Sequence, residues 1–469
     1  MPTDLDLTSY WVRTAPTPGY APLEDDRSVD VAVIGGGIVG ITTAYLLKRE
    51  GLRVAVLERR EVSRGVTGYT TAKITSSHSL IYTTLLKKFG EEGARTYGRA
   101  NQAGIEKIAS LVEELSISCD FERAENFIYT EDPRYLQDVR DEVEAAKKVG
   151  LPADFTTDTE LPFPIQGAVR FANQAQFHPR DYLLALAASI DGGGSHVFEG
   201  SAVTGVDQGD LCKVRTERGS VTATDVVVAT HMPILDRGMF FTKVHPYRSY
   251  AIAGRIEGRA MPRGMYLSTG AGSTRSIRSI RDGDERLLLV GGEGHKTGTE
   301  PDTMKFYRRL ERWASHHYGL DDPPYRWATQ DNVSVDNVPY VGRLTRGSDH
   351  VYTATGFGKW GMTNGTVSAL ILTDLIVGRS NDWASLYDSK RIKPLASGQK
   401  FVQENTEVAT HFVGDRLSAE HRGNPRCTHM GCVLRKNTGE GTWDCPCHGS
   451  RFDADGNVIQ GPAIAPLSQ

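Results

Sequence analysis

Four cysteines and two histidines gather in two short motifs near the C-terminus, CTHMGC and CPCHGS. Two thiolates and two imidazoles on paired loops could hold a tetrahedral zinc ion, and they also suit a [2Fe–2S] cluster with cysteines on one iron and histidines on the other. The candidate metal ligands are Cys427, His429, Cys445 and His448. The remaining pair, Cys432 and Cys447, occupies the same two loops and could clamp them with a disulfide, for which a small zinc site has no need. The motifs predict a metal centre and favour the iron–sulfur cluster.

A glycine-rich loop near the N-terminus offers a second kind of chemistry, phosphate binding. An apolar run ends in GGGIVG, a helix-like segment follows over 41–50, and a second apolar strand over 53–57 ends at Glu58. This order is that of a complete βαβ dinucleotide-binding unit. Gly37 would let the backbone approach a pyrophosphate at the helix N-terminus, and Glu58 would accept hydrogen bonds from a ribose. These residues alone do not distinguish FAD from NAD.

Two further glycine-rich turns could approach the same ligand. Residues 64–73 form a loop whose hydroxyl and N–H groups suit a phosphate or a flavin ring, although the same composition is typical of an ordinary loop. Residues 351–355 predict a strand, 356–365 a turn, and 366–377 a helix whose N-terminus could face the polar edge of an isoalloxazine. No second G-x-G-x-x-G occurs, which argues against a flavin reductase with a separate pyridine-nucleotide domain.

Most of the candidate site residues lie in these segments. The expected cofactor-binding residues are Gly35, Gly37, Ile38, Val39, Gly40, Glu58, Arg59, Thr67, Thr70, Thr71, Ala72, Val203, Gly356, Gly358, Lys359, Trp360, Gly361, Met362 and Thr363. No catalytic residue can be assigned, and the candidates for a catalytic or substrate-binding role are Lys73, Arg248, Tyr250 and Arg278. The arginines could bind a carboxylate through bidentate contacts, or they could belong to a solvated face.

The composition argues against several classes of protein. A net charge of −4 with 24% charged residues is not that of a nucleic-acid-binding protein. No run reaches the roughly 18 apolar residues of a membrane span, and the N-terminus lacks the basic and apolar regions of a signal peptide. We therefore expect a cytoplasmic protein that has no membrane span and does not bind nucleic acid.

The pattern of elements indicates several domains in the 469 residues. Helical periodicity over 80–117 and 133–149 alternates with strand-like pieces, which predicts a second lobe inserted into the first within residues 1–390. The expected cofactor-binding lobe covers about 28–90, 175–240 and 330–390, and the expected substrate lobe covers about 91–174 and 241–329. Residues 391–469 are turn-rich and strand-forming and are expected to be a separate domain.

Up to about residue 385, the chain resembles the D-amino-acid-oxidase-like superfamily of FAD-dependent oxidoreductases, which includes glycine oxidase, sarcosine oxidase and the gamma-glutamylputrescine oxidoreductases. The matching parts are GGGIVG with Glu58, the Gly65 to Lys73 loop, FHPRDYL, VVVATH, and D-x-x-P-Y-V-G followed by ATGFGKWGMT. The resemblance implies FAD, and hydride transfer from a carbon next to an amine nitrogen to flavin N5. The TGYTTAK and KWGMT turns depart from the smaller oxidases, so their substrate-binding residues and oxygen-activating lysine have no safe counterparts here.

The C-terminal part resembles the Rieske iron–sulfur domains of the cytochrome bc type. That resemblance implies that the two cysteine ligands bind one iron and the two histidine ligands the other, and that Ser450 donates a hydrogen bond to the cluster. The family often has Tyr at the position of Phe452. Rieske domains also occur in ring-hydroxylating oxygenases, but the sequence lacks a paired-histidine and carboxylate motif for their mononuclear iron. The whole chain thus resembles bacterial FAD-dependent oxidoreductases that carry a C-terminal Rieske domain.

These resemblances imply an α/β FAD-binding Rossmann-like domain with an inserted α+β substrate domain and a small all-β Rieske domain. The expected activity is oxidation of a C–N bond in an amine or amino acid by FAD, with electrons passing through the cluster to an external acceptor. Two alternatives stay open. One is an oxidase whose flavin reacts with oxygen while the cluster is structural or regulatory, and the other is an electron-transfer module without an organic substrate of its own.

Overall fold

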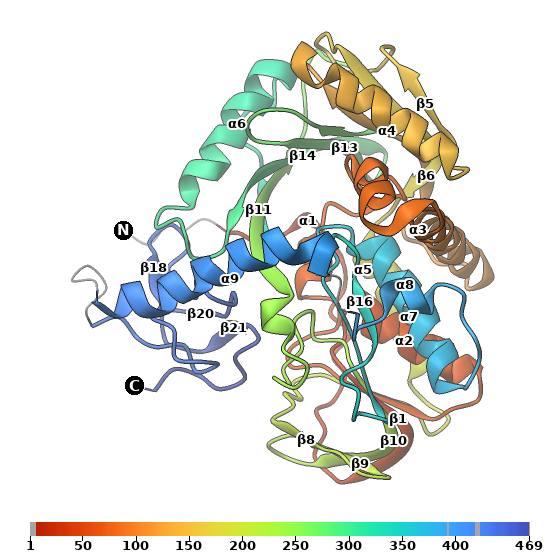
Figure 1. The fold of residues 1–469 in the computed structure, drawn as a ribbon, viewed down its shortest axis with the longest axis vertical. Coiled ribbons are helices and arrows are strands. Elements are labelled where there is room, and N and C mark those ends of the chain that lie inside the picture. Colours follow the sequence, from red (N-terminus) through yellow and green to blue (C-terminus); the bar gives the residue numbers. More distant parts are fainter. Residues whose placement is uncertain (1–5, 392–393, 418–422, 469) are drawn as a thin grey trace.

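The computed structural model describes residues 6–391, 394–417 and 423–468 (Figure 1). Its described strands form three sheets of eight, nine and four strands. We call the part built on the first sheet the nucleotide lobe, the part built on the second the substrate lobe, and the part from residue 394 onward the C-terminal domain. The predicted fold class, an α/β domain with an inserted α+β domain and a small C-terminal sheet, is confirmed.

The nucleotide lobe is built on a parallel sheet with β1 at its centre. The strand order is β16-β17-β10-β1-β2-β7, with the β8–β9 hairpin attached to β10 and with β16 antiparallel to β17. The strands are β1 (Arg27–Ile34), β2 (Val54–Leu57), β7 (His196–Phe198), β8 (Gly205–Asp207), β9 (Cys212–Arg215), β10 (Ser220–Val228), β16 (Tyr340–Arg343) and β17 (Val351–Thr355). Consecutive residues of β2 and β17 are all buried, as expected for strands covered on both faces.

Three helices position the glycine-rich loops at the carboxyl ends of these strands. They are α2 (Ile38–Arg49), α5 (Pro179–Ile190) and α7 (Gly361–Ile376), and α2 packs against both of the others. A Cβ at Gly365 would lie 2.8 Å from the Ile38 side chain, so the N-terminal turns of α2 and α7 approach each other closely. The open carboxyl edge of a parallel sheet is where ligands bind in such folds.

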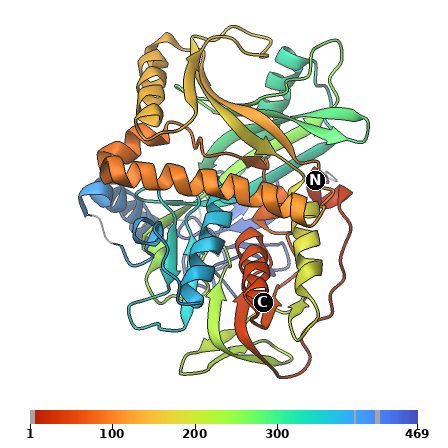
Figure 2. The same cartoon turned by 90° about the vertical axis from the view of Figure 1, so that its right-hand side faces the viewer.

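The substrate lobe is a mostly antiparallel sheet that curls over the nucleotide lobe. Its order is β15-β11-β14-β13-β12-β4-β6-β3, with β5 beside β6. The strands are β3 (Lys73–Ile74), β4 (Glu122–Thr130), β5 (Ala153–Thr156), β6 (Gly167–Gln176), β11 (Val244–Gly254), β12 (Met265–Ser268), β13 (Arg275–Asp282), β14 (Glu285–Lys296) and β15 (Tyr325–Ser334). The helices α4 (Leu136–Lys148) and α6 (Met304–Tyr318) lie on this lobe, and the long α3 (Ile81–Glu114) crosses the molecule between the lobes (Figure 2).

Short elements complete the two lobes. They are α1 (Tyr10–Thr14), α8 (Ala384–Tyr387) and the 3-10 turns η1 (Val66–Tyr69), η2 (Pro133–Tyr135) and η3 (Phe240–Thr242). A loop over 229–241 leaves the carboxyl end of β10 and runs into the η3 turn. No helix within the described residues is both long and apolar enough to cross a membrane.

The C-terminal domain is an antiparallel sheet of β18 (Arg435–Asn437), β19 (Thr442–Asp444), β20 (Arg451–Phe452) and β21 (Val458–Gln460). The domain begins with the long helix α9 (Pro394–Leu417), so the expectation that residues 391–469 are turn-rich and strand-forming is wrong for its first part. The helix is held by its surroundings: Lys296 of β14 pairs with Glu404 and Glu407, and Val408 packs against the core of the C-terminal domain. Contacts from other parts of the chain, rather than a strong sequence pattern, account for α9.

Candidate active site and iron–sulfur centre

A cavity of about 720 Å³ lies where the three parts of the molecule meet. At one end it is lined by the glycine-rich loop from Gly35 to Val39, and further along by the turn from Phe357 to Met362. Side chains of β11 and β15 continue the lining in the substrate lobe. The last wall comes from the C-terminal domain, which contributes Glu440, Thr442, Arg451 and residues near its C-terminus, among them Ile464. The C-terminal domain is therefore part of the cavity wall.

The glycine-rich loop has the geometry of a dinucleotide site. Gly35 has a φ of +106° and lies so close to β10 that a Cβ would be 2.6 Å from the Ala229 carbonyl oxygen, so only glycine fits there. Gly37 is the N-cap of α2 and brings no capping side chain, which leaves N–H groups of the first turn for an anion. Glu58 accepts a hydrogen bond from the Gly36 N–H at 2.7 Å, and the Thr67 hydroxyl accepts one from Ile38 at 3.2 Å. The residues present fit a nucleotide cofactor.

Most of the expected cofactor-binding residues line the cavity. The exceptions are Gly40, Ala72, Gly356 and Thr363. Gly40 serves packing, since a Cβ there would lie 1.9 Å from the Gly35 carbonyl oxygen, and the Thr363 hydroxyl donates to the Thr75 carbonyl. Lys359 in the second turn lines the cavity, and burial there lowers its pKa.

Beside this turn lies a buried histidine that sequence reasoning missed. The His78 ring stacks on Trp360, its Nδ1 lies 2.6 Å from the Tyr97 hydroxyl, and its Nε2 lies 3.1 Å from the Thr363 hydroxyl. Burial lowers the pKa of His78 to about 3, so the imidazole is neutral near pH 7. A lone histidine in a polar loop carries no sequence pattern that predicts these contacts.

The four candidate substrate contacts have different surroundings. Lys73, Arg248 and Tyr250 line the cavity, and Arg278 does not. The guanidinium of Arg278 donates to the Ala72 carbonyl at 2.6 Å and packs on the ring of Trp11, and burial lowers its pKa to about 9. Lys73 donates to the Tyr266 carbonyl at 2.5 Å and makes no ion pair within the described part of the chain. Burial, with a contribution from Arg278, lowers the pKa of Lys73 well below its ordinary value.

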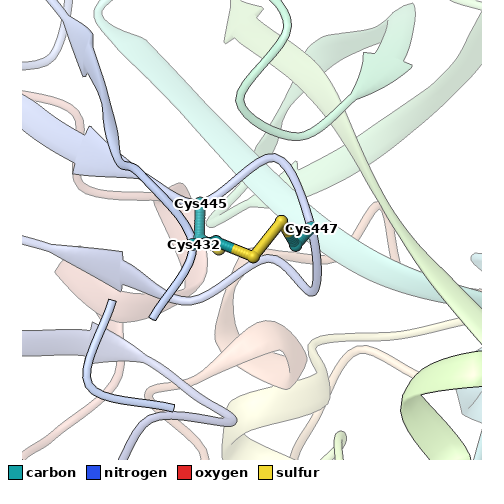
Figure 3. Close-up of side chains that lie close together, drawn as sticks. All are labelled: Cys432, Cys445 and Cys447. Carbon is teal, nitrogen blue, oxygen red and sulfur yellow. A yellow bond between two sulfur atoms is a disulfide. The ribbon is translucent and has the colours of Figure 1, made fainter. Parts of the chain in front are cut away.

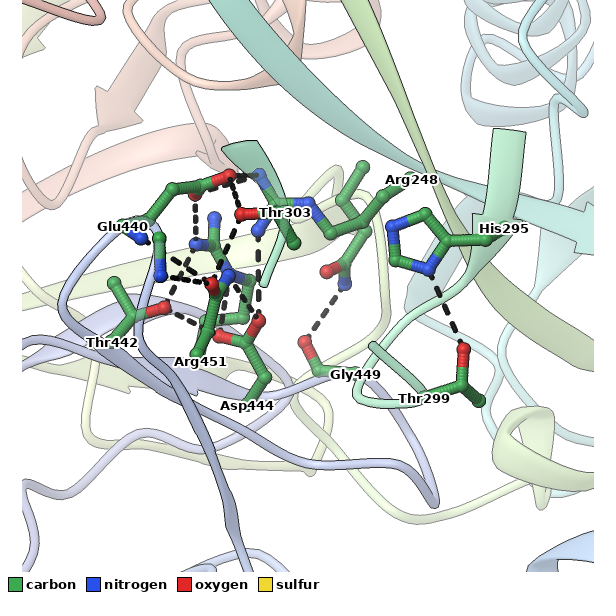
Figure 4. A network of polar contacts seen from close by, with 12 residues as sticks. Arg248, His295, Thr299, Thr303, Glu440, Thr442, Asp444, Gly449 and Arg451 are labelled. Atoms are coloured by element: carbon green, nitrogen blue, oxygen red, sulfur yellow. Dashed lines mark hydrogen bonds and ion pairs between the residues drawn. The ribbon is translucent and has the colours of Figure 1, made fainter. Parts of the chain in front are cut away.

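Arg248 belongs to a buried ion network between the substrate lobe and the C-terminal domain (Figure 4). Its Nη2 donates to both carboxylate oxygens of Glu440 at 2.8 Å, and Arg451 donates to Glu440 at 2.6 Å and to Asp444 at 2.9 Å. The side chains of these four residues are 1 to 10% exposed. Burial opposes the charges, but the two arginines outweigh it and lower the pKa of Glu440. Two cations and two anions thus balance at a desolvated interface, where Thr303 adds a hydrogen bond.

This balance makes Glu440 critical for stability. Glu440→Gln would leave two buried arginines with only the Asp444 carboxylate, and breaking a buried ion pair from one side costs about 3–5 kcal/mol. We expect the variant to unfold at markedly lower denaturant concentration than the parent protein, with the transition followed by circular dichroism on the cofactor-loaded protein.

Two controls separate this effect from a general loss of charge. Glu50→Gln removes a surface carboxylate paired with Arg379 and should leave the denaturation midpoint nearly unchanged. Adding Arg248→Met to Glu440→Gln restores the charge balance between Arg451 and Asp444, so the double variant should be more stable than Glu440→Gln alone. A double variant that is less stable than the single one would contradict the charge-balance argument.

The cysteines of the C-terminal domain lie in one buried group. Cys432 and Cys447 form a disulfide, and the Cys445 sulfur lies within 4.8 Å of both of their sulfurs (Figure 3). Because disulfide sulfurs are not thiolates, only Cys445 of this trio can ligate a metal. The Cys427 thiol hydrogen-bonds to Cys445 and to the Ser450 hydroxyl, and the bond with Cys445 lowers its pKa. The two unpaired thiols are thus adjacent on paired loops clamped by the disulfide.

The two histidines of the motifs face this group with free ring nitrogens. His429 Nδ1 and His448 Nδ1 are buried and have no hydrogen-bond partner among the residues that the structure describes. The two rings are 5.2 Å apart and perpendicular, and Phe241 of the η3 turn packs edge-on against both. Buried nitrogens without partners are costly unless they ligate a metal. Two adjacent thiols and two such imidazoles fit a cluster with two sulfur and two nitrogen ligands.

A hydrogen bond joins the cavity wall to the loop that contains Cys445 and His448. Gln330 of β15 lines the cavity, and its Nε2 donates to the Gly449 carbonyl at 2.8 Å. Gly449 follows His448 in the chain and has a φ of +80°, and a Cβ there would lie 2.5 Å from Gln330 Nε2. The Gly449 backbone can therefore approach Gln330 this closely only because glycine has no side chain. Sequence reasoning missed Gln330, because nothing near it in the chain indicates its partner.

The fold and the two sites define the class of protein, and comparisons with known proteins agree. The family model described as FAD dependent oxidoreductase matches residues 30–375, and the model of the Rieske [2Fe-2S] domain matches residues 388–469. The chain belongs to this family of FAD-dependent oxidoreductases and carries a C-terminal Rieske domain. Its cofactors are FAD and a Rieske [2Fe–2S] cluster.

Individual relatives and one solved structure resemble the chain over most of its length. It is 35% identical to the Rieske-type protein YhfW of Bacillus subtilis (strain 168) over 98% of this chain and 97% of that protein. It is 25% identical to gamma-glutamylputrescine oxidoreductase of Escherichia coli (strain K12) over 79% of this chain and 89% of the relative. The crystal structure of glycine oxidase from Geobacillus kaustophilus superposes with a TM-score of 0.66 at 16% identity, covering 78% of this chain and 99% of that one. The likeness to glycine oxidase shows that the fold is shared, and the family match makes the chain an FAD-dependent oxidoreductase.

Proposed function

We propose that the protein oxidises a C–N bond of an amine or amino acid with FAD and passes the electrons through the Rieske cluster to an external acceptor. The observation that carries the proposal is the contact between Gln330 and Gly449, because it joins the cavity wall to the residue next to a proposed cluster ligand. FAD would accept two electrons from the substrate, and the cluster would release them one at a time. The acceptor is unidentified, and a cytoplasmic location stays a prediction.

The proposed cluster ligands are the two thiols of Cys427 and Cys445 and the Nδ1 atoms of His429 and His448. Support comes from the adjacency of the thiols and from the partnerless state of both ring nitrogens. The loops from Gly35 to Val39 and from Phe357 to Met362 would hold FAD, which supplies the hydride acceptor when bound.

Among the candidate substrate contacts, we propose that Lys73 and Tyr250 meet the substrate. Both line the cavity, and Lys73 is not neutralised by a carboxylate within the described residues. A substrate anion entering the cavity would favour the charged form of such a lysine. Arg248 already forms an ion pair with Glu440, so its proposed role is to hold the C-terminal domain in place.

The test is anaerobic mixing of the cofactor-loaded protein with a panel of amines and amino acids, with flavin and cluster absorbance followed separately. Flavin bleaching followed by reduction of the cluster is the expected result. Bleaching that leaves the cluster oxidised would favour the oxidase alternative. If no compound in a broad panel bleached the flavin but a reduced carrier protein did, the electron-transfer module would be favoured.

The substitution Phe452→Tyr should raise the reduction potential of the cluster. Phe452 is fully buried in the core that contains the four cysteines of this domain, so a hydroxyl there needs a partner inside that core. A hydrogen bond from tyrosine to a ligand sulfur strengthens as charge accumulates on reduction. A net value of about 1 to 1.5 kcal/mol corresponds to roughly 40 to 60 mV for a one-electron couple. A redox titration followed by the paramagnetic signal of the reduced cluster measures the shift, and an unchanged or lower potential would mean that residue 452 does not face the cluster.

A further inference from the structure

A carboxylate of the nucleotide lobe touches a histidine of the cluster loops. The Oδ1 atom of Asp236 lies 2.7 Å from Nε2 of His429, while Nδ1 of the same ring is buried and has no partner among the described residues. The His429 side chain is 5% exposed and the Asp236 side chain 55% exposed. One ring nitrogen therefore faces the cluster loops and the other is tied to a different lobe of the protein.

Asp236 belongs to a loop that reaches both functional sites. The loop over 229–241 leaves the carboxyl end of β10, and its first residues, including Thr230 and His231, line the cavity. Further along, Asp236 contacts His429, and Phe241 packs against both histidine rings. The same loop is thus part of the cavity wall and part of the surroundings of the cluster histidines.

The second histidine of the cluster loops has different contacts. His448 has no carboxylate contact within the described residues, and its ring packs against the rings of His429 and Phe241. The carboxylate therefore acts on one imidazole of the pair. A carboxylate that accepts a hydrogen bond from a ligand imidazole fixes the ring and makes it a stronger electron donor to the metal.

We propose that Asp236 is a positioning residue that holds His429 through Nε2 and keeps the reduction potential of the cluster low. Its negative charge opposes the addition of an electron to the cluster, and its hydrogen bond stabilises the oxidised form. The inference rests on His429 being a cluster ligand, as proposed above. It does not depend on the identity of the substrate or on electron transfer from the flavin.

The test compares Asp236→Asn, Asp236→Glu and the parent protein, each loaded with both cofactors. A mediated titration with a chemical reductant gives the potential of the cluster without substrate, and the paramagnetic signal of the reduced cluster reports its ligand field. Asp236→Asn keeps the shape but removes the charge. It should raise the ratio of reduced to oxidised cluster at a fixed potential by about three- to tenfold, or roughly 30 to 60 mV for a one-electron couple. Asp236→Glu restores the charge and should return the potential toward that of the parent protein.

Asp210→Asn is the matched control, because it removes one exposed aspartate from the turn between β8 and β9 of the same lobe. Its potential should equal that of the parent protein. An Asp236→Asn potential equal to that of the parent protein, or below it, would overturn the proposal. Loss of the cluster from Asp236→Asn but not from Asp236→Glu would support the proposal. Loss of the cluster from both variants would overturn it, because Asp236 would then have only a structural role. Failure of the ligand assignment is separable, because it would appear as a cluster retained in a His429→Ala protein.

Discussion

His429→Ala should abolish turnover with a one-electron acceptor while leaving reduction of the flavin by substrate intact. The imidazole has a buried Nδ1 without a partner and is one of the four proposed cluster ligands, and alanine supplies no ligand atom in its place. Without the cluster, the proposed one-electron route from the flavin to an external acceptor is missing. The cavity itself is not changed, since His429 does not line it.

Three measurements on the same protein separate the possibilities. Iron content and the paramagnetic signal report the cluster, anaerobic bleaching reports flavin reduction, and dye-linked turnover reports the complete chain. His316→Ala, which removes an exposed histidine from α6, is the control and should leave all three unchanged. Normal acceptor-linked turnover in a cluster-free His429→Ala protein would rule out the proposed electron path and would favour the oxidase alternative.

The parts of the site that could be predicted are those whose residues are close in the chain. The loop that contains Gly35 and Gly37 is followed at once by its helix and second strand, so the whole βαβ unit is visible in one stretch. The cysteines and histidines of the cluster occupy two motifs whose spacing reflects paired loops. In both cases the chemistry needs a particular local backbone, and the sequence has to encode it locally.

The parts that could not be predicted depend on partners far along the chain. Arg248 pairs with a glutamate 192 residues later, Asp236 meets His429 at a separation of 193 residues, and Gln330 meets Gly449 at 119. An arginine in a strand looks the same in sequence whether it meets a substrate carboxylate or a buried glutamate. The docking of the C-terminal domain decides between these outcomes, and no local pattern describes that docking. Helix α9 is a similar case, because its contacts with Lys296 and with the C-terminal core fix it in place.

The substitution Gly37→Val should yield a folded protein that has lost its flavin. The backbone of Gly37 has φ −85° and ψ −171°, which any residue can adopt, and a Cβ there would meet only the Thr67 hydroxyl at 3.2 Å. The apoprotein should therefore tolerate the new side chain. The space that the side chain would fill lies at the N-terminus of α2, where the pyrophosphate of FAD is expected to approach the backbone. Gly37→Ala should lose less flavin than Gly37→Val because it adds only one carbon.

Gly37 is the position of choice because its neighbours in the motif would not give a clean result. Gly35 needs its positive φ and Gly40 lies against the Gly35 carbonyl, so side chains at either position would disturb the fold as well as the ligand.

Flavin content is measured by absorbance after denaturation, and the paramagnetic signal of the Rieske cluster in the same sample serves as an internal test of folding. Gly347→Val, in an exposed turn where a Cβ meets nothing within 4 Å, is the control and should keep both cofactors. A Gly37→Val protein with a full complement of flavin would contradict the assignment of this loop to the pyrophosphate, whereas loss of flavin with the cluster signal intact would locate the effect at the nucleotide loop.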